Sequence, residues 1–179
     1  MLRPTNKEKL LNVFFHDPIA DGTGYRLREL SRIVGVAPTS IKIYLKELIT
    51  EGLVVVKEER ATKYPLYAAN IENNDFTLRK KIHTLLSIHE SGLMDYISEE
   101  CMPNAVVLFG STSLGEDTKQ SDIDLFVMSE ETNLNLKNYE NKLGRKIHVF
   151  FSGNFGKLSK ELKNNIANGI VLKGYLKIF

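Results

Sequence analysis

The sequence predicts a two-domain α+β protein, because the spacing of its apolar residues changes near the middle of the chain. Up to residue 72, apolar residues recur at helical intervals and then form two short strand-like runs. From residue 104, short apolar runs such as "AVVLF" and "DIDLFV" alternate with polar helical segments, which is typical of a sheet covered by helices. We therefore expect domains over 1–72 and 104–179, with helices over 73–103 between them.

The composition fits this class and excludes several others. The 179 residues are 42% hydrophobic and 26% charged, and 24 basic against 22 acidic residues give a formal net charge of +2. Any nucleic-acid binding must therefore rest on local basic patches. The single cysteine, Cys101, excludes an intrachain disulfide, and the apolar runs are far shorter than a membrane span. We expect a cytoplasmic protein with no membrane partner.

Three helices and a strand pair are expected in the first domain. Apolar residues recur at helical spacing in "NKEKLLNVFF" and in "YRLRELSRIV". In "PTSIKIYLKELITEG", Pro38 suits a first helical turn, an i, i+4, i+7 apolar stripe starts at Ile41, and Gly52 provides a stop. The runs "LVVVKEER" and "YPLYAAN" then predict two strands around a charged turn.

The stretch from Tyr25 to Asn70, "YRLRELSRIVGVAPTSIKIYLKELITEGLVVVKEERATKYPLYAAN", resembles the winged helix-turn-helix DNA-binding domains of bacterial and archaeal transcription regulators. The resemblance implies that the third helix enters the major groove of double-stranded DNA and that the hairpin contacts its backbone. The candidate DNA-binding residues are then Thr39, Ser40, Lys42, Ile43, Lys46, Arg60 and Lys63. A solvated helix face and a protein-interaction module are the alternatives, and a palindromic operator would require a homodimer.

The connecting segment "NDFTLRKKIHTLLSIHESGLMDYISEE" has apolar residues at helical intervals and a weak point at Ser91-Gly92. We expect one bent helix or two helices here. The apolar stripe suits packing on either domain or on a second copy of the chain.

Two aspartates stand one residue apart at the start of an apolar strand. Because side chains alternate between the faces of a strand, the carboxylates of Asp122 and Asp124 point to the same side. Two like charges this close destabilise each other unless a cation joins them, and Mg²⁺ (or Mn²⁺) prefers such oxygens together with water and phosphate. Gly110 allows a tight turn after "AVVLF", and Ser111 offers its hydroxyl and amide to a phosphate. We predict a metal site at the aspartates and a nucleotide-binding site at Gly110 and Ser111.

The order Gly110-Ser111, ten residues, then Asp122-Ile123-Asp124 resembles the motif of the nucleotidyltransferase β superfamily, and within it the minimal nucleotidyltransferases, including antitoxins paired with HEPN toxins. The likeness covers about residues 76–179. It implies an α/β mixed sheet, a divalent metal, a nucleoside triphosphate as ligand or donor, and a HEPN-type toxin as a candidate protein partner.

The third carboxylate of active members has no counterpart in this sequence. The matching strand is "RKIHVFF", where His148 stands at the acid position. A neutral imidazole binds metals and accepts a proton near pH 7, so His148 joins Asp122 and Asp124 as a candidate catalytic residue. The alternative is a polar residue in a half-buried strand. Glu116 and Asp117, in the loop before the aspartates, are at positions unlike that of the third acid.

Two functions follow for the whole chain. The first is a DNA-binding transcription regulator whose nucleotidyltransferase-like domain binds a metal-nucleotide or a protein and changes DNA affinity. The second is an active nucleotidyltransferase that transfers a nucleoside monophosphate from a nucleoside triphosphate to a hydroxyl on a protein or a small molecule. The missing third carboxylate favours the first, and the aspartate pair favours the second, so the sequence leaves open whether the chain is an enzyme.

Overall fold

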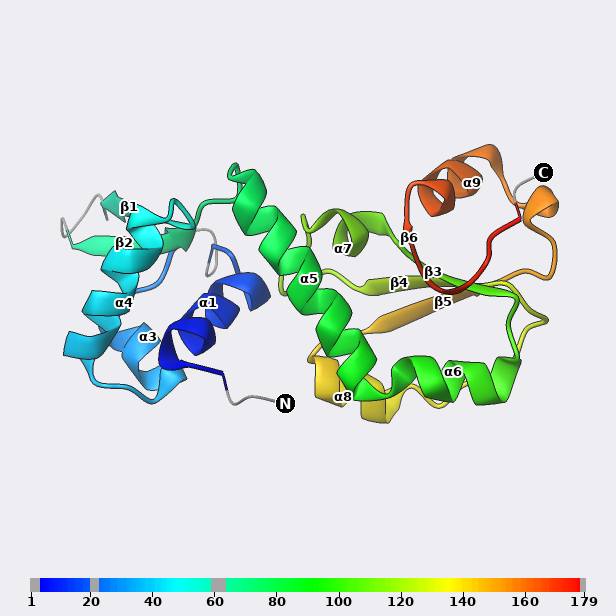
Figure 1. The fold of residues 1–179 in the computed structure, drawn as a ribbon, viewed down its shortest axis with the longest axis horizontal. Coiled ribbons are helices and arrows are strands. Elements are labelled where there is room, and N and C mark those ends of the chain that lie inside the picture. The colour runs from blue at the N-terminus through cyan, green and yellow to red at the C-terminus, as the bar shows by residue number, and fades with distance from the viewer. Residues whose placement is uncertain (1–3, 20–22, 59–63, 178–179) are drawn as a thin grey trace. The chain divides into compact units, whose positions relative to one another are not determined.

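The computed structural model describes residues 4–19, 23–58 and 64–177, and the chain divides into two compact units, Met1–Lys80 and Lys81–Phe179 (Figure 1). Each unit has its own hydrophobic core. The division falls inside α5 (Asn74–Ser91), within the predicted connecting segment. The assignment of that segment to one domain or the other stays a prediction.

The first unit contains the predicted three helices and strand pair. They are α1 (Asn6–His16), α3 (Leu27–Val34), α4 (Pro38–Thr50), β1 (Val54–Glu58) and β2 (Pro65–Ala69). The two strands pair antiparallel. Pro38 stands in the first turn of α4, and Gly52, with a φ of 72°, follows its end, as the sequence predicts.

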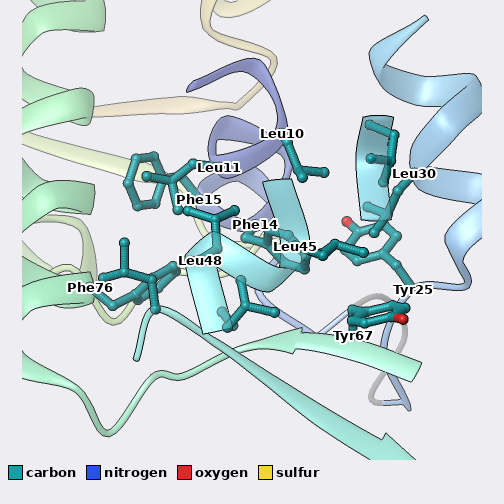
Figure 2. Close-up of a cluster of buried hydrophobic side chains, with 14 residues drawn as sticks. Leu10, Leu11, Phe14, Phe15, Tyr25, Leu30, Leu45, Leu48, Tyr67 and Phe76 are labelled. Atoms are coloured by element: carbon teal, nitrogen blue, oxygen red, sulfur yellow. The ribbon is translucent and has the colours of Figure 1, made fainter. Parts of the chain in front are cut away.

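Apolar side chains from these helices and from the hairpin meet in the core of the first unit, which Figure 2 shows. The ring of Phe14 from α1 meets that of Tyr25 edge-on, with ring centroids 5.6 Å apart. Phe76, in the first turn of α5, is buried here beside Phe15, with ring centroids 5.3 Å apart. Burying one such ring contributes roughly 1.5–3 kcal/mol to stability, so these contacts hold the start of α5 to the first unit.

The second unit is built on a four-stranded sheet with the strand order β5-β4-β3-β6. Its strands are β3 (Ala105–Phe109), β4 (Ile123–Val127), β5 (Ile147–Phe151) and β6 (Ile170–Gly174). The central strand β3 is antiparallel to both neighbours, whereas β4 and β5 run parallel and are connected through α8 (Lys137–Leu143). The mixed sheet that the family resemblance implies is therefore confirmed.

The two faces of this sheet pack against different helices. On one face, Val106 and Leu108 lie in a cluster with residues of α5, α6 (Leu93–Cys101) and α8. On the other face, Val107 and Phe109 pack with Phe155 of the short 3-10 helix η1 (Phe155–Lys157) and with α9 (Lys160–Ala167). This second face also carries Asp124, because Asp124 and the buried Phe126 are two residues apart on β4.

The predicted break at Ser91-Gly92 is present. The helix α5 ends at Ser91, Gly92 takes the left-handed conformation with a φ of 80°, and α6 begins at Leu93. Two helices, rather than one bent helix, therefore fill the connecting segment. Within the described ranges, none of the helices combines the length and the apolar character needed to cross a membrane.

Candidate functional site

The two predicted metal ligands lie at the start of β4, on the sheet face that carries Phe126. Asp124 is the second residue of β4 and pairs with Phe109 of β3 on one side and with His148 of β5 on the other. Asp122 directly precedes the strand. Their side chains are 36% (Asp122) and 27% (Asp124) exposed, so both reach solvent from a partly buried position.

The structure brings His148 next to both carboxylates. Its Nε2 lies 3.7 Å from Oδ2 of Asp122, and its Nδ1 lies 3.8 Å from Oδ1 of Asp124. Both carboxylates therefore face one imidazole ring, as expected for residues on the same side of a strand. The parallel register of β4 and β5 places His148 directly opposite Asp124.

Gly110 determines how closely the chain after β3 approaches Asp124. Its φ is 71°, in the left-handed region that favours glycine, and a Cβ at this position would lie 2.6 Å from Oδ2 of Asp124. The expected tight turn is the beginning of a short helix, α7 (Gly110–Leu114). Ser111 is the second residue of α7 and is partly buried. Gly110 thus leaves the space that the Asp124 carboxylate occupies.

The electrostatic surroundings of Asp124 disfavour its ionised form. Burial raises the pKa of Asp124, His148 lowers it, the neighbouring Asp122 carboxylate raises it, and Arg145 lowers it; the net pKa is above the ordinary value for aspartate. A bound cation would reverse this shift, because it stabilises both carboxylates in their charged form. A carboxylate with a raised pKa beside a second carboxylate is a common feature of functional sites.

A buried ion pair, which was not predicted from the sequence, contacts the main chain next to the aspartates. Nη1 of Arg145 donates to Oδ2 of Asp117 over 2.7 Å, and the two side chains are 8% and 3% exposed. The same guanidinium donates from Nε to the Ser121 carbonyl over 2.8 Å and from Nη2 to the Asp122 carbonyl over 2.9 Å. Asp117 is 28 residues from Arg145 in sequence, and no local pattern connects the two.

The aspartates and His148 lie in a stretch of the chain that matches a family model. Residues 92–172 match the family model of the nucleotidyltransferase domain. The match runs from the start of α6 into β6 and contains Gly110, Asp122, Asp124 and His148. The second unit therefore holds a nucleotidyltransferase domain. A comparison with curated proteins finds no match.

The chemistry of the nucleotidyltransferase domain suits a divalent cation held by two carboxylates. Asp122 and Asp124 offer carboxylate oxygens on the same side of β4, and Gly110 leaves room for the Asp124 carboxylate. In the part of the chain that the structure describes, no group of three or more His, Cys, Asp or Glu side chains is arranged to hold a metal ion. Two carboxylates are enough to bind Mg²⁺ or Mn²⁺, because water and phosphate oxygens complete the coordination of the ion. The role of His148 as a catalytic residue stays a prediction.

The predicted DNA-binding residues belong to the first unit. On α4, the stripe of Ile41, Leu45 and Leu48 is buried in the core. The opposite side carries the candidates: Thr39, Lys42, Ile43 and Lys46 are exposed, and Ser40 is partly buried. Arg60 and Lys63 lie outside the described residues. The structure therefore places the α4 candidates on the side of this helix that faces away from the core of the first unit.

Proposed function

We propose that the nucleotidyltransferase domain binds a nucleoside triphosphate together with Mg²⁺ or Mn²⁺, and that the chain uses this site in a DNA-binding transcription regulator. The observation that carries the proposal is the pairing of two carboxylates on one side of β4, with the pKa of Asp124 raised and Gly110 close against it. Asp122 and Asp124 would hold the cation. Ser111 would contribute its hydroxyl and amide to a phosphate.

Nuclear magnetic resonance of the histidine rings tests the location of the cation. His148 lies within 4 Å of both carboxylates, and the chain has four histidines. Because Mn²⁺ is paramagnetic, its binding at the aspartates should broaden the His148 ring signals at low Mn²⁺ concentration. The same titration of Asp124→Asn should leave His148 sharp. Equal broadening in both proteins would contradict the proposed site.

The first unit is proposed to be the DNA-binding half, as a winged helix-turn-helix domain. The specific support is the exposed face of α4, where Lys42 and Lys46 lie one helical turn apart beside Thr39 and Ile43. Two such ammonium groups suit phosphate contacts, and the shorter side chains suit base edges in the major groove. A second copy of the chain is the proposed partner for a palindromic operator. Titration with genomic DNA fragments at several salt concentrations tests this function.

An active transferase is the alternative function, and the position of His148 favours it. The acceptor hydroxyl oxygen would form a bond to the α-phosphorus, the bond from that phosphorus to the pyrophosphate oxygen would break, and pyrophosphate would leave. His148, exposed beside both carboxylates, would take the hydroxyl proton. When bound, the cation supplies charge neutralisation and alignment of the phosphates.

Release of labelled pyrophosphate tests the alternative. A nucleoside triphosphate labelled on its γ-phosphate is incubated with Mg²⁺ or Mn²⁺ and with candidate acceptors, of which a HEPN-type toxin is the one that the family resemblance implies. Release should stop in Asp122→Asn and Asp124→Asn, and should fall about 10²- to 10⁴-fold in His148→Ala if His148 is the general base. Release that is unchanged in the aspartate variants would exclude transfer at this site.

A further inference from the structure

Two side chains hydrogen-bond to the main chain at Ser121 and Asp122, where the chain enters β4. The carbonyl of Asp122 accepts from Nη2 of Arg145 over 2.9 Å and from Oγ1 of Thr112 over 3.0 Å. The preceding carbonyl, that of Ser121, accepts from Nε of Arg145 over 2.8 Å. One guanidinium therefore fixes two consecutive peptide units at the point where the chain enters β4.

The guanidinium is itself fixed. Nη1 donates to the buried Asp117 carboxylate over 2.7 Å, and Nη2 donates to Oγ1 of Thr112 over 2.7 Å. Arginine presents five N–H donors in a rigid plane, and its bonds to carboxylate in a poorly solvated place are short and strong. A lysine, with three donors on a single nitrogen, does not span the same acceptors.

The bonds of Arg145 join every segment that contributes to the candidate site. Thr112 lies in α7, next to the segment of Gly110 and Ser111. Ser121 and Asp122 lead into β4. Arg145 itself leads into β5, where the carbonyl of the next residue, Lys146, accepts from the N–H of Ile123 over 2.9 Å and begins the parallel pairing that sets His148 beside Asp124.

We propose that Arg145, paired with Asp117, is a positioning residue for the metal site: through the main chain of Ser121 and Asp122 it fixes the position of the Asp122 carboxylate relative to Asp124 before the cation binds. This inference rests on the proposed metal-nucleotide function of the domain. Residues that orient metal ligands in this way typically change metal affinity about 10- to 100-fold when they are replaced.

Mn²⁺ affinity, measured by electron paramagnetic resonance together with the thermal unfolding temperature, tests the inference. The main variant is the double substitution Arg145→Met with Asp117→Asn. It removes both buried charges at similar volume, a change that folded proteins often tolerate, but it also removes the donors to the Ser121 and Asp122 carbonyls. We expect an unfolding temperature close to that of the wild type and an Mn²⁺ affinity about 10- to 100-fold lower. The spectrum of the bound ion should also broaden, because Asp122 no longer has a single position.

Two further variants test whether a lower Mn²⁺ affinity comes from the lost orientation of Asp122 or only from a change in stability or charge. Arg145→Lys keeps the positive charge facing Asp117 but lacks the planar set of donors, so its Mn²⁺ affinity should also fall. Lys137→Met removes one positive charge from an exposed side chain of the same unit and should leave the affinity unchanged. A folded double variant, or a folded Arg145→Lys variant, that binds Mn²⁺ as tightly as the wild type would overturn the inference. If the wild type does not bind Mn²⁺, or if Asp124→Asn binds it equally well, the proposed metal site is wrong and the inference falls with it.

Discussion

At the scale of single residues, Asp124 is an ionisable group in surroundings that oppose its negative charge. Its carboxylate is partly buried, and Asp122, His148 and Gly110 crowd it. Without a cation, burial and the charge of Asp122 oppose ionisation, so the folded chain at neutral pH contains a carboxylate in an unfavourable place. Functional sites often retain such a local loss of stability.

The first prediction concerns the stability of Asp124→Asn. Because the pKa of Asp124 is raised in the folded state, that state holds the proton more tightly than the unfolded chain, and stability falls as pH rises from the unfolded pKa through the folded one. Asparagine never ionises, so Asp124→Asn should be more stable than the metal-free wild type at pH 7. The advantage should be smallest below about pH 3, where the wild-type carboxyl is protonated in both states.

Urea unfolding at pH 7 and at pH 3 measures this difference. The exposed Glu131→Gln is the control for the loss of one negative charge. Adding Mn²⁺ at about 100 times its dissociation constant should stabilise the wild type by about 2.7 kcal/mol and leave the Asp124→Asn variant unchanged. A lower urea midpoint for Asp124→Asn at pH 7 would contradict the account of Asp124.

The second prediction concerns Gly110→Ala. Alanine at a φ of 71° introduces backbone strain of about 1–2 kcal/mol, and its Cβ would also displace the Asp124 carboxylate. We expect the variant to be less stable in urea unfolding and to lose Mn²⁺ binding, measured by electron paramagnetic resonance. Gly35→Ala is the matched control, because Gly35 has a φ of 72° and open space around its Cβ position. If Gly110→Ala binds Mn²⁺ normally, the close approach of Gly110 to Asp124 is not needed for the site.

At the scale of elements, the sequence predicted what depends on neighbours along the chain. The buried stripe of α4 follows from helical spacing, and the fully buried β3 follows from an unbroken apolar run. The same local rules put both aspartate carboxylates on one side of a strand. The position of His148 beside them came from the family resemblance, because strand register cannot be derived from spacing alone.

The ion pair of Arg145 and Asp117 could not be predicted from the sequence. Each residue alone looks like an ordinary surface charge, and charged residues are rarely buried unless they are paired. The pairing depends on how the loop before β4 folds over the start of β5, which is a tertiary contact across 28 residues. Sequence reasoning therefore located the groups proposed to touch the cation and missed the groups that hold them in place.

The third prediction belongs to α4. If its exposed face contacts DNA phosphates, Lys42→Ala and Lys46→Ala should each weaken binding to all sequences and lower the slope of log affinity against log salt by about 1. Fluorescence titration of DNA fragments at several salt concentrations measures this slope. Lys160→Ala, an exposed lysine of the second unit, should leave the slope unchanged. If both lysine variants keep the wild-type slope, the proposed DNA-binding face is wrong.

At the scale of the whole molecule, the chain combines two units with different proposed tasks. The first unit carries an exposed face with two lysines on α4, and the second carries the nucleotidyltransferase domain. A single helix, α5, supplies Phe76 to the core of one unit and Ile88 to the core of the other. If nucleotide binding changes the affinity for DNA, DNA must change the affinity for the nucleotide by the same factor.

The central claim is that the nucleotidyltransferase domain binds a metal-nucleotide through its aspartate pair. Calorimetric titration of the full chain with ATP, GTP, CTP and UTP, first with Mg²⁺ and then with Mn²⁺, tests it most directly, with Asp124→Asn as the control variant. We predict that at least one nucleotide binds only when metal is present, and that its affinity falls at least tenfold in the variant, a loss of about 1.4 kcal/mol. Absence of binding with either metal, or equal binding by the Asp124→Asn variant, would contradict the claim and leave the aspartates as inherited parts of the fold.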